Sequence, residues 1–127
     1  METPVKQRLL VIDDEESLRH MLSVLLKRQG YRVDTAADGS EGLALAQKGR
    51  YDFILCDIKM PVMDGIEAAC QILSEMPGMK ILALSMYTDN GFIEGMMHAG
   101  ARGYIAKDSD PEELYKAIRQ AAGPGNS

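Results

Sequence analysis

The chain has 127 residues, the size of one ordinary domain. Hydrophobic residues make up 46% of it and charged residues 26%, which supplies enough apolar surface for a core and excludes a disordered chain. No apolar run reaches the roughly 18–20 residues of a membrane-spanning helix, so we expect no membrane contact. The formal net charge of −5 argues against direct nucleic-acid binding, which needs a basic surface.

The cysteines and the chain ends indicate the compartment and the domain limits. Cys56 and Cys70 each lie in an apolar segment, and we interpret both as buried thiols of a reducing, cytoplasmic compartment. Residues 1–6 and 123–127 carry no hydrophobic pattern, so we interpret them as a short tail and as a disordered tail or linker stub. The single domain is therefore expected to span residues 7–122.

Five short segments with apolar character are predicted to be β-strands. The first and the fourth are nearly continuous apolar runs, which is typical of strands covered on both faces. The predicted strands are Arg8–Asp13, Arg32–Ala36, Asp52–Cys56, Lys80–Leu84 and Gly103–Ala106.

Amphipathic segments separate these strands. Asp64 is expected to cap a helix that turns Cys70 inward. Asp110 is expected to cap another helix, because a proline follows it at the first helical position and a glutamate stands three residues after it. Two further helices are predicted at about Ser40–Lys48 and Asn90–Ala99, each ending at a glycine. The first helix is predicted to place five apolar residues inward, namely Leu18, Met21, Leu22, Leu25 and Leu26.

Alternating strands and helices indicate an α/β fold. Right-handed crossovers place the helices on both faces of a parallel sheet, which gives three layers. In such doubly wound folds, ligands bind beside the carboxyl ends of the strands. The residues at the strand ends are therefore the candidates for function.

Polar side chains follow four of the five predicted strands. Asp13 and Asp14 close the first, Asp57 follows the third, Ser85 the fourth and Lys107 the fifth. Neighbouring first and third strands would bring the three carboxylates together, where a hard cation relieves their repulsion, and oxygen ligands favour Mg²⁺. A metal, a lysine and a hydroxyl around one carboxylate predict a receptor for a phosphoryl group, with Asp57 as the nucleophile. Each residue taken alone has an ordinary surface or capping role, and their joint placement indicates the site.

The chain resembles the receiver domain of two-component response regulators from about Gln7 to Ala122. A departure, Asp108 in place of the proline that often follows the lysine, makes it similar to the NarL/LuxR-type subfamily. The stretches that carry the resemblance are Val11–Glu15, Cys56–Pro61, Met63–Gly65, Leu84–Ser85 and Gly103–Lys107.

The resemblance implies a fold and a reaction. The sheet would have the flavodoxin-like strand order 2-1-3-4-5 with five helices. Asp57 would accept a phosphoryl group from a histidine kinase or phosphotransfer protein. The protein would be a signalling phosphoacceptor that assists its own phosphorylation, not an enzyme. Mg²⁺ would be held by Asp57, directly by Asp14, mainly through water by Asp13, and by the main-chain carbonyl of Lys59.

The resemblance also implies how the signal leaves the site. Lys107 and Ser85 would contact the phosphoryl oxygens, and Tyr104 would act as the switch. Lys59 and Tyr87 would flank the path of the water that removes the phosphoryl group. An output domain or a second copy would bind the face formed by the fourth helix, fifth strand and fifth helix. Apart from the resemblance, we interpret the nine methionines mostly as core residues, with an adaptable partner surface as the alternative for Met86, Met96 and Met97 around the fourth helix.

Three other functions share this fold or this chemistry. A flavodoxin-like electron carrier is disfavoured, because the acidic run Asp13–Glu16 would repel a cofactor phosphate. An aspartyl-phosphate phosphatase uses a second aspartate two residues on, where this chain has Lys59. A degenerate receiver that acts only as a protein-docking module is the remaining alternative. The sequence also leaves open whether the chain is free-standing or part of a longer regulator.

Overall fold

The computed structural model describes residues 7–60, 63–86 and 90–122. A five-stranded parallel sheet forms the middle layer, with the order β2-β1-β3-β4-β5 that the resemblance implied. The tails expected at 1–6 and 123–127 lie outside the described residues, as does Tyr87. The strands are β1 (Arg8–Ile12), β2 (Arg32–Ala36), β3 (Phe53–Asp57), β4 (Ile81–Ser85) and β5 (Gly103–Ala106).

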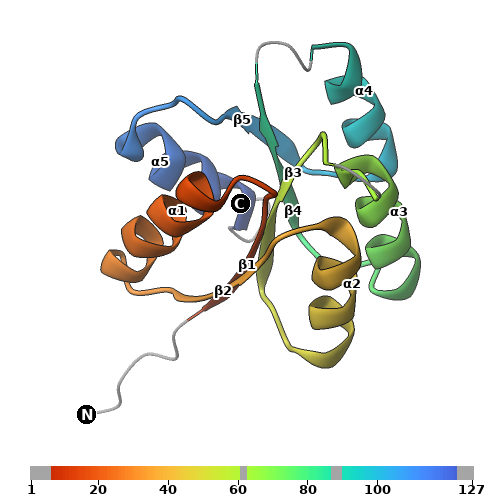
Figure 1. Cartoon of the computed structure of the whole chain (residues 1–127), viewed down its shortest axis with the longest axis horizontal. Helices are drawn as coiled ribbons and strands as arrows, with labels where there is room; N and C mark the ends of the chain where they lie inside the picture. The colour runs from red at the N-terminus through yellow and green to blue at the C-terminus, as the bar shows by residue number, and fades with distance from the viewer. Residues whose placement is uncertain (1–6, 61–62, 87–89, 123–127) are drawn as a thin grey trace.

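Five helices form the two outer layers (Figure 1). One face of the sheet is covered by α1 (Glu16–Arg28) and α5 (Pro111–Ala122). The other face is covered by α2 (Gly39–Lys48), α3 (Gly65–Glu75) and α4 (Asn90–Ala99). The predicted three-layer α/β fold is confirmed. None of the helices among the described residues combines the length and apolar character that a membrane crossing needs.

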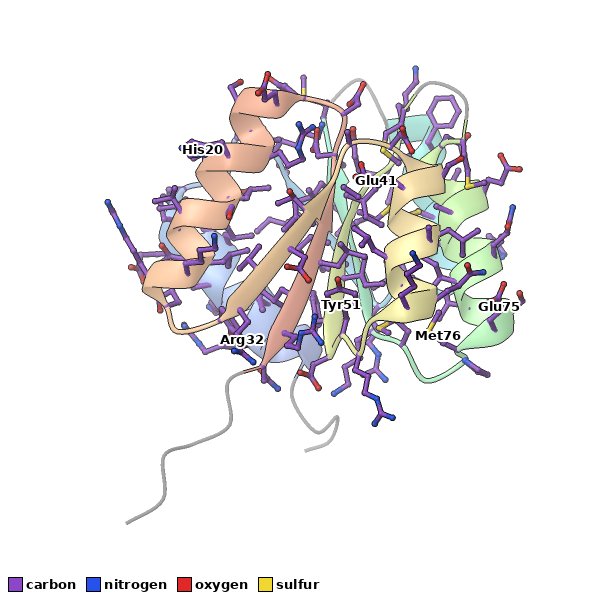
Figure 2. All side chains as sticks on the ribbon, turned by 60° about the horizontal axis from the view of Figure 1, so that its bottom comes forward. His20, Arg32, Glu41, Tyr51, Glu75 and Met76 are labelled. Atoms are coloured by element: carbon purple, nitrogen blue, oxygen red, sulfur yellow. The ribbon has the colours of Figure 1, made fainter. Side chains whose placement is uncertain are left out.

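Alternation along the strands divides the core into two halves, which fill the spaces on either side of the sheet (Figure 2). On β1, Leu10 and Ile12 pack with the α2–α4 side, whereas Leu9 and Val11 pack with the α1–α5 side. All five residues of β3 and all five of β4 are buried. This two-sided burial explains the nearly continuous apolar runs of the sequence.

Among the described residues, aspartates start three of the helices. In each case the side chain accepts a hydrogen bond from the backbone N–H three residues later, which satisfies a donor that the helix itself cannot pair. The predicted caps at Asp64 and Asp110 are confirmed. The bonds join Asp38 to Glu41 (2.8 Å), Asp64 to Glu67 (2.9 Å) and Asp110 to Glu113 (3.1 Å).

Two predicted strands are shifted by one residue. The third begins at Phe53 and not at Asp52, and it includes Asp57 as its last residue. The fourth likewise includes Ser85. The cause is the sheet register, since Asp57 is paired with Leu84 across the β3–β4 ladder. Both candidate site residues therefore belong to rigid strands.

Two side chains do not lie where the helical pattern placed them. Met21 is 44% exposed because the buried stripe of α1 is narrower than predicted and is centred on Leu22 and Leu26. Cys70 is exposed because the buried face of α3 is formed by residues 65, 68, 69 and 72, and position 70 lies on the opposite face. Met96 is fully buried, as expected of a core methionine, so it does not contribute to the alternative of an adaptable surface at the fourth helix.

Gly65 permits a close approach between α3 and the chain that follows β3. Its N–H donates a 2.7 Å hydrogen bond to the carbonyl of Ile58. A Cβ at this position would overlap the main-chain carbonyl oxygen of Asp57 and lie 2.9 Å from Cα of Ile58. These are backbone atoms, so they could move only if Asp57 moved with them.

We therefore expect Gly65→Ala to lower the free energy of unfolding by about 1–3 kcal/mol, the usual cost of overpacking. Urea unfolding measures the change. Gly78→Ala is the matched control, because a Cβ there meets no atom within 4 Å. Equal stabilities of the two variants would contradict the close approach. Without the overlap, alanine at position 65 would be expected to stabilise the helix relative to glycine.

Candidate functional site

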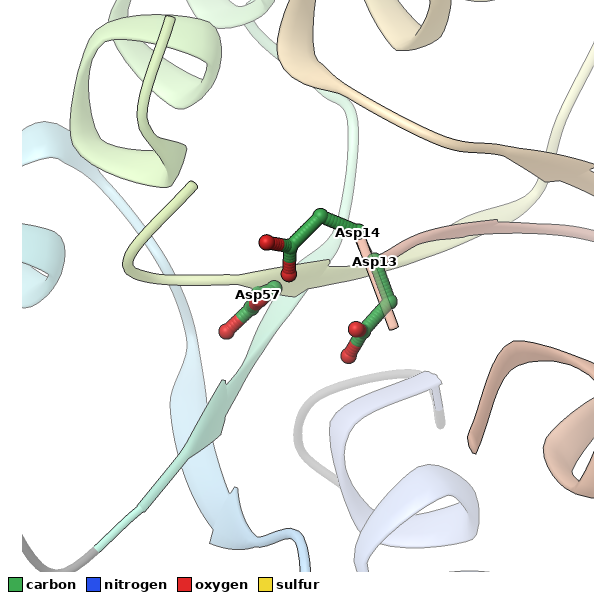
Figure 3. A group of neighbouring side chains, drawn as sticks. All are labelled: Asp13, Asp14 and Asp57. Atoms are coloured by element: carbon green, nitrogen blue, oxygen red, sulfur yellow. The ribbon is translucent and has the colours of Figure 1, made fainter. Parts of the chain in front are cut away.

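Three carboxylates meet at the carboxyl edge of the sheet. Asp13 and Asp14 follow β1 directly, and Asp57 ends the neighbouring strand β3. One carboxylate oxygen from each lies within 4.8 Å of the others, and Figure 3 shows the three side chains gathered between the strand ends. Asp13 and Asp57 are buried, whereas Asp14 is exposed to solvent. The cluster is thus open on the Asp14 side.

Lys107 bridges the two buried carboxylates. Its Nζ lies 3.1 Å from Oδ2 of Asp13 and 3.1 Å from Oδ1 of Asp57, and its side chain is 9% exposed. The second oxygen of Asp57, Oδ2, is buried and has no hydrogen-bond partner among the described residues. A single ammonium balances one of the three carboxylate charges. The cluster is therefore deficient in positive charge, which suits a bound cation.

The main chain and α1 hold Asp13 in place. Its Oδ1 accepts a 2.8 Å hydrogen bond from the N–H of Glu15, and its main-chain carbonyl accepts a 2.8 Å bond from the Arg19 guanidinium. Its N–H donates to the carbonyl of Ala36 on β2 (3.0 Å). Sequence reasoning missed Arg19. Its position within the first turns of α1, directly after the acidic loop, is the signal that could have indicated it.

Burial changes the protonation of the site. Burial, reinforced by the charge of Asp13, raises the pKa of the Asp57 carboxyl from 3.8 to about 7, although Lys107 opposes the shift. Burial also raises the pKa of Asp13 against the opposing effects of the Glu15 N–H and of Lys107. For Lys107, burial lowers the pKa, but the charges of Asp57 and Asp13 outweigh it and the net shift is upward. The lysine is therefore a permanent cation at neutral pH.

Ser85 and Lys107 are tied together at the ends of β4 and β5. The N–H of Lys107 donates a 2.8 Å bond to the carbonyl of Ser85. The Ser85 hydroxyl donates a long 3.4 Å bond to the carbonyl of Ile105. Such a long bond leaves the hydroxyl easily redirected toward a stronger acceptor. Beside these residues lies a hollow of about 520 Å³ whose lining includes Tyr104, which is 56% exposed.

The side chain of Lys59 contacts α4. It is exposed, and its Nζ lies 4.8 Å from the centroid of the Phe92 ring on α4. Sequence reasoning missed Phe92, because no local pattern connects a loop residue to a helix more than thirty positions later. The main-chain carbonyl of Lys59 as a metal ligand stays a prediction.

The donor set fits a hard divalent cation. It consists of carboxylate oxygens, with one exposed member through which an ion could enter, and such ligands favour Mg²⁺ or Ca²⁺ over softer metals. The same arrangement offers a buried carboxylate oxygen beside a fixed ammonium. Chemically, this is a nucleophile with a cation ready to receive developing negative charge.

Comparisons with known proteins agree with this geometry. The model of the response regulator receiver domain matches residues 9–119. The transcriptional regulatory protein LiaR of Bacillus subtilis is 40% identical over 117 residues, which are 91% of this chain and 56% of LiaR. This chain spans about half the length of the curated relatives it matches.

Solved structures show the same fold. The chemotaxis protein CheY4 of Vibrio cholerae is 37% identical with a TM-score of 0.86, covering 92% of this chain and 99% of that one. The response regulator TrrA of Thermotoga maritima, solved in complex with Mg²⁺ and BeF, is 32% identical with a TM-score of 0.83, covering 91% and 98%. Receiver domains are signalling phosphoacceptors, and the acidic cluster at Asp13, Asp14 and Asp57 could hold a metal. The chain belongs to the response regulator receiver domain family.

Proposed function

We propose that Asp57 is the residue of this receiver domain that accepts the phosphoryl group. The observation that carries the proposal is its buried Oδ2, which has no hydrogen-bond partner among the described residues while Oδ1 is held by Lys107. One oxygen is thus oriented by the ammonium, and the other is not engaged in a hydrogen bond in the described part of the chain. In the transfer, an Asp57 oxygen forms a bond to phosphorus as the P–N bond of a phosphohistidine breaks, and the bonding electron pair goes to the imidazole nitrogen.

Mg²⁺ is the cofactor that we assign to the acidic cluster. Asp14 and Asp57 would bind it directly, Asp13 mainly through water, and Lys59 through its main-chain carbonyl. When bound, the ion would offset the carboxylate repulsion and stabilise charge on the phosphoryl oxygens. Through this arrangement the domain would assist its own phosphorylation and dephosphorylation.

Lys107, Ser85 and Tyr104 would connect the phosphoryl group to the surface. Lys107 would contact one phosphoryl oxygen, and the Ser85 hydroxyl would leave its long bond to Ile105 for another. The movement of Ser85 would then let Tyr104, which lines the same hollow, turn inward. This would change the outer face of the molecule.

We propose that the changed face binds the next partner in the signalling chain. Large apolar side chains exposed on and beside α4 and β5 support this assignment, namely Met86, Phe92, Met97 and Tyr104. The partner would be an output domain or a second copy of the chain, and the phosphodonor a histidine kinase or phosphotransfer protein. Residues 7–122 would form the receiver unit, acting in the cytoplasm. A purely docking module is not favoured, because it would not need Asp13, Asp14, Asp57 and Lys107 gathered in one place.

Phosphorylation of Asp57 can be tested directly. With acetyl phosphate and Mg²⁺, the intact mass should increase by about 80 Da, one phosphoryl group. Asp57→Asn should abolish the increase, whereas Asp52→Asn, exposed just before the start of the same strand, should retain it. An adduct of the same yield on Asp57→Asn would refute the assignment.

The metal site predicts a stability effect. Millimolar Mg²⁺ should raise the Tm of the wild-type domain, because a ligand that binds only the folded state stabilises it by mass action. Asp14→Ala should remove most of this increase, and since Asp14 is exposed its loss should leave the metal-free Tm nearly unchanged. Glu16→Ala, exposed at the start of α1, is the control that should keep the response. A wild-type Tm that does not respond to Mg²⁺ would count against the site.

The raised pKa of Asp57 predicts a pH-dependent effect of its removal. In EDTA, native Asp57 keeps its proton up to about pH 7, whereas the unfolded carboxyl loses it near 3.8, so the native state binds more protons in that window. Its contribution to the free energy of unfolding therefore falls as the pH rises through the window.

Asp57→Asn, which stays neutral, should be little different in stability from wild type near pH 4. It should become more stable than wild type by at least about 1.4 kcal/mol at pH 8, the equivalent of one pKa unit. Urea unfolding at several pH values measures the difference. A difference that does not change with pH would show that Asp57 titrates normally.

A further inference from the structure

One side chain connects the phosphorylation loop to α4. Lys59 follows Asp57 by two residues, and its Nζ lies 4.8 Å from the centroid of Phe92 in the first turn of α4. This is within the distance at which an ammonium is attracted to the face of an aromatic ring. The contact therefore joins the loop that would bind the phosphoryl group to the helix of the proposed output face.

The main chain is fixed at both ends of this contact. Ile58 and Met60, on either side of Lys59, are both buried. On α4, Met96 is fully buried, and Gly95 lies so close to Ile66 of α3 that a Cβ would approach its Cδ1 to 2.9 Å. By contrast, Lys59 is exposed and Phe92 is 42% exposed. The two side chains are therefore free to separate without repacking the core.

The relative strengths of two interactions decide where the ammonium resides. At an exposed site a cation–π contact is worth about 0.5–1 kcal/mol. A charge-assisted hydrogen bond to a phosphoryl oxygen is stronger than this contact, and a phosphoryl group on Asp57 brings about −2 charge to a position two residues from Lys59. Lys107 does not remove this attraction, because its single charge is also shared with Asp13 and cannot balance the phosphoryl group alone. The phosphoryl group therefore outcompetes the ring.

We propose that Phe92 is a positioning residue that holds the Lys59 ammonium away from Asp57 in the unphosphorylated domain, and that a phosphoryl group on Asp57 draws Lys59 off the ring and releases this tie to α4. The inference rests on the proposed phosphorylation of Asp57. Because coupling between two sites is reciprocal, a partner that covers the Phe92 ring would in turn free Lys59 and favour the phosphorylated state.

The test compares affinities for beryllofluoride, an unreactive stand-in for the phosphoryl group, in the presence of Mg²⁺. Phe92→Leu keeps an apolar side chain but removes the ring, so beryllofluoride should bind about two- to fivefold more tightly, the equivalent of the lost 0.5–1 kcal/mol. Phe92→Tyr keeps the ring face and should restore wild-type affinity. Lys59→Met should bind more weakly than wild type, and adding Phe92→Leu to it should cause no further change.

A spectroscopic measurement separates positioning from a general structural effect. Protons that lie over a ring face are shielded, so the Lys59 Hε signals should be shifted upfield in the free wild-type domain. Their chemical shifts should return toward ordinary values when beryllofluoride is added. In the Phe92→Leu variant they should have ordinary values even without beryllofluoride. The inference would be overturned if Phe92→Leu changed the beryllofluoride affinity equally with lysine and with methionine at position 59, or if it caused no change at all. Either result would leave the proposed phosphorylation of Asp57 intact. Failure of wild-type protein to bind Mg²⁺ and beryllofluoride would overturn the proposed function as well.

Discussion

The position of one ammonium group organises this molecule. Lys107 lies 3.1 Å from a carboxylate oxygen of Asp13 and 3.1 Å from one of Asp57, and both acids are buried. Without that bridge, two buried carboxyl groups would face each other with no positive charge between them, and their ionised forms would be disfavoured further. With it, the residues can be held close together in the metal-free state. The shortage of positive charge that remains is what makes the site receptive to a further cation.

The sheet makes this bridge possible. Its strand order sets β1 beside β3, and β4 between β3 and β5, so the ends that carry Asp13, Asp57, Ser85 and Lys107 lie along one edge. The hydrogen bond from the Lys107 N–H to the Ser85 carbonyl fixes the last two relative to each other. Strands buried on both faces cannot shift easily, because every displaced side chain would lose its packing. Rigid strand ends thus hold the reactive groups, while the side chains at the surface keep their freedom.

That division between rigid and free parts has a functional consequence. The long bond of the Ser85 hydroxyl, the exposed Tyr104 ring and the Lys59–Phe92 contact are all weak interactions next to a strongly charged site. Each is weak enough to be replaced when charge is added at Asp57, and each leads outward toward α4 or β5. A signal can therefore leave the site through small side-chain movements that leave the core intact.

The sequence by itself determined the alternation of strands and helices, the caps at Asp64 and Asp110, and the set of polar strand-end residues. These follow from local spacing, since hydrophobic periodicity and capping depend on residues near one another in the chain. The order of the strands came only from resemblance to a family. Tertiary structure alone decided that Met21 and Cys70 are exposed, that Asp57 ends a strand, that Arg19 holds the Asp13 carbonyl and that Lys59 rests on Phe92. Each of these depends on which elements become neighbours in space, and contacts between residues far apart in the chain cannot be read from local hydrophobic periodicity.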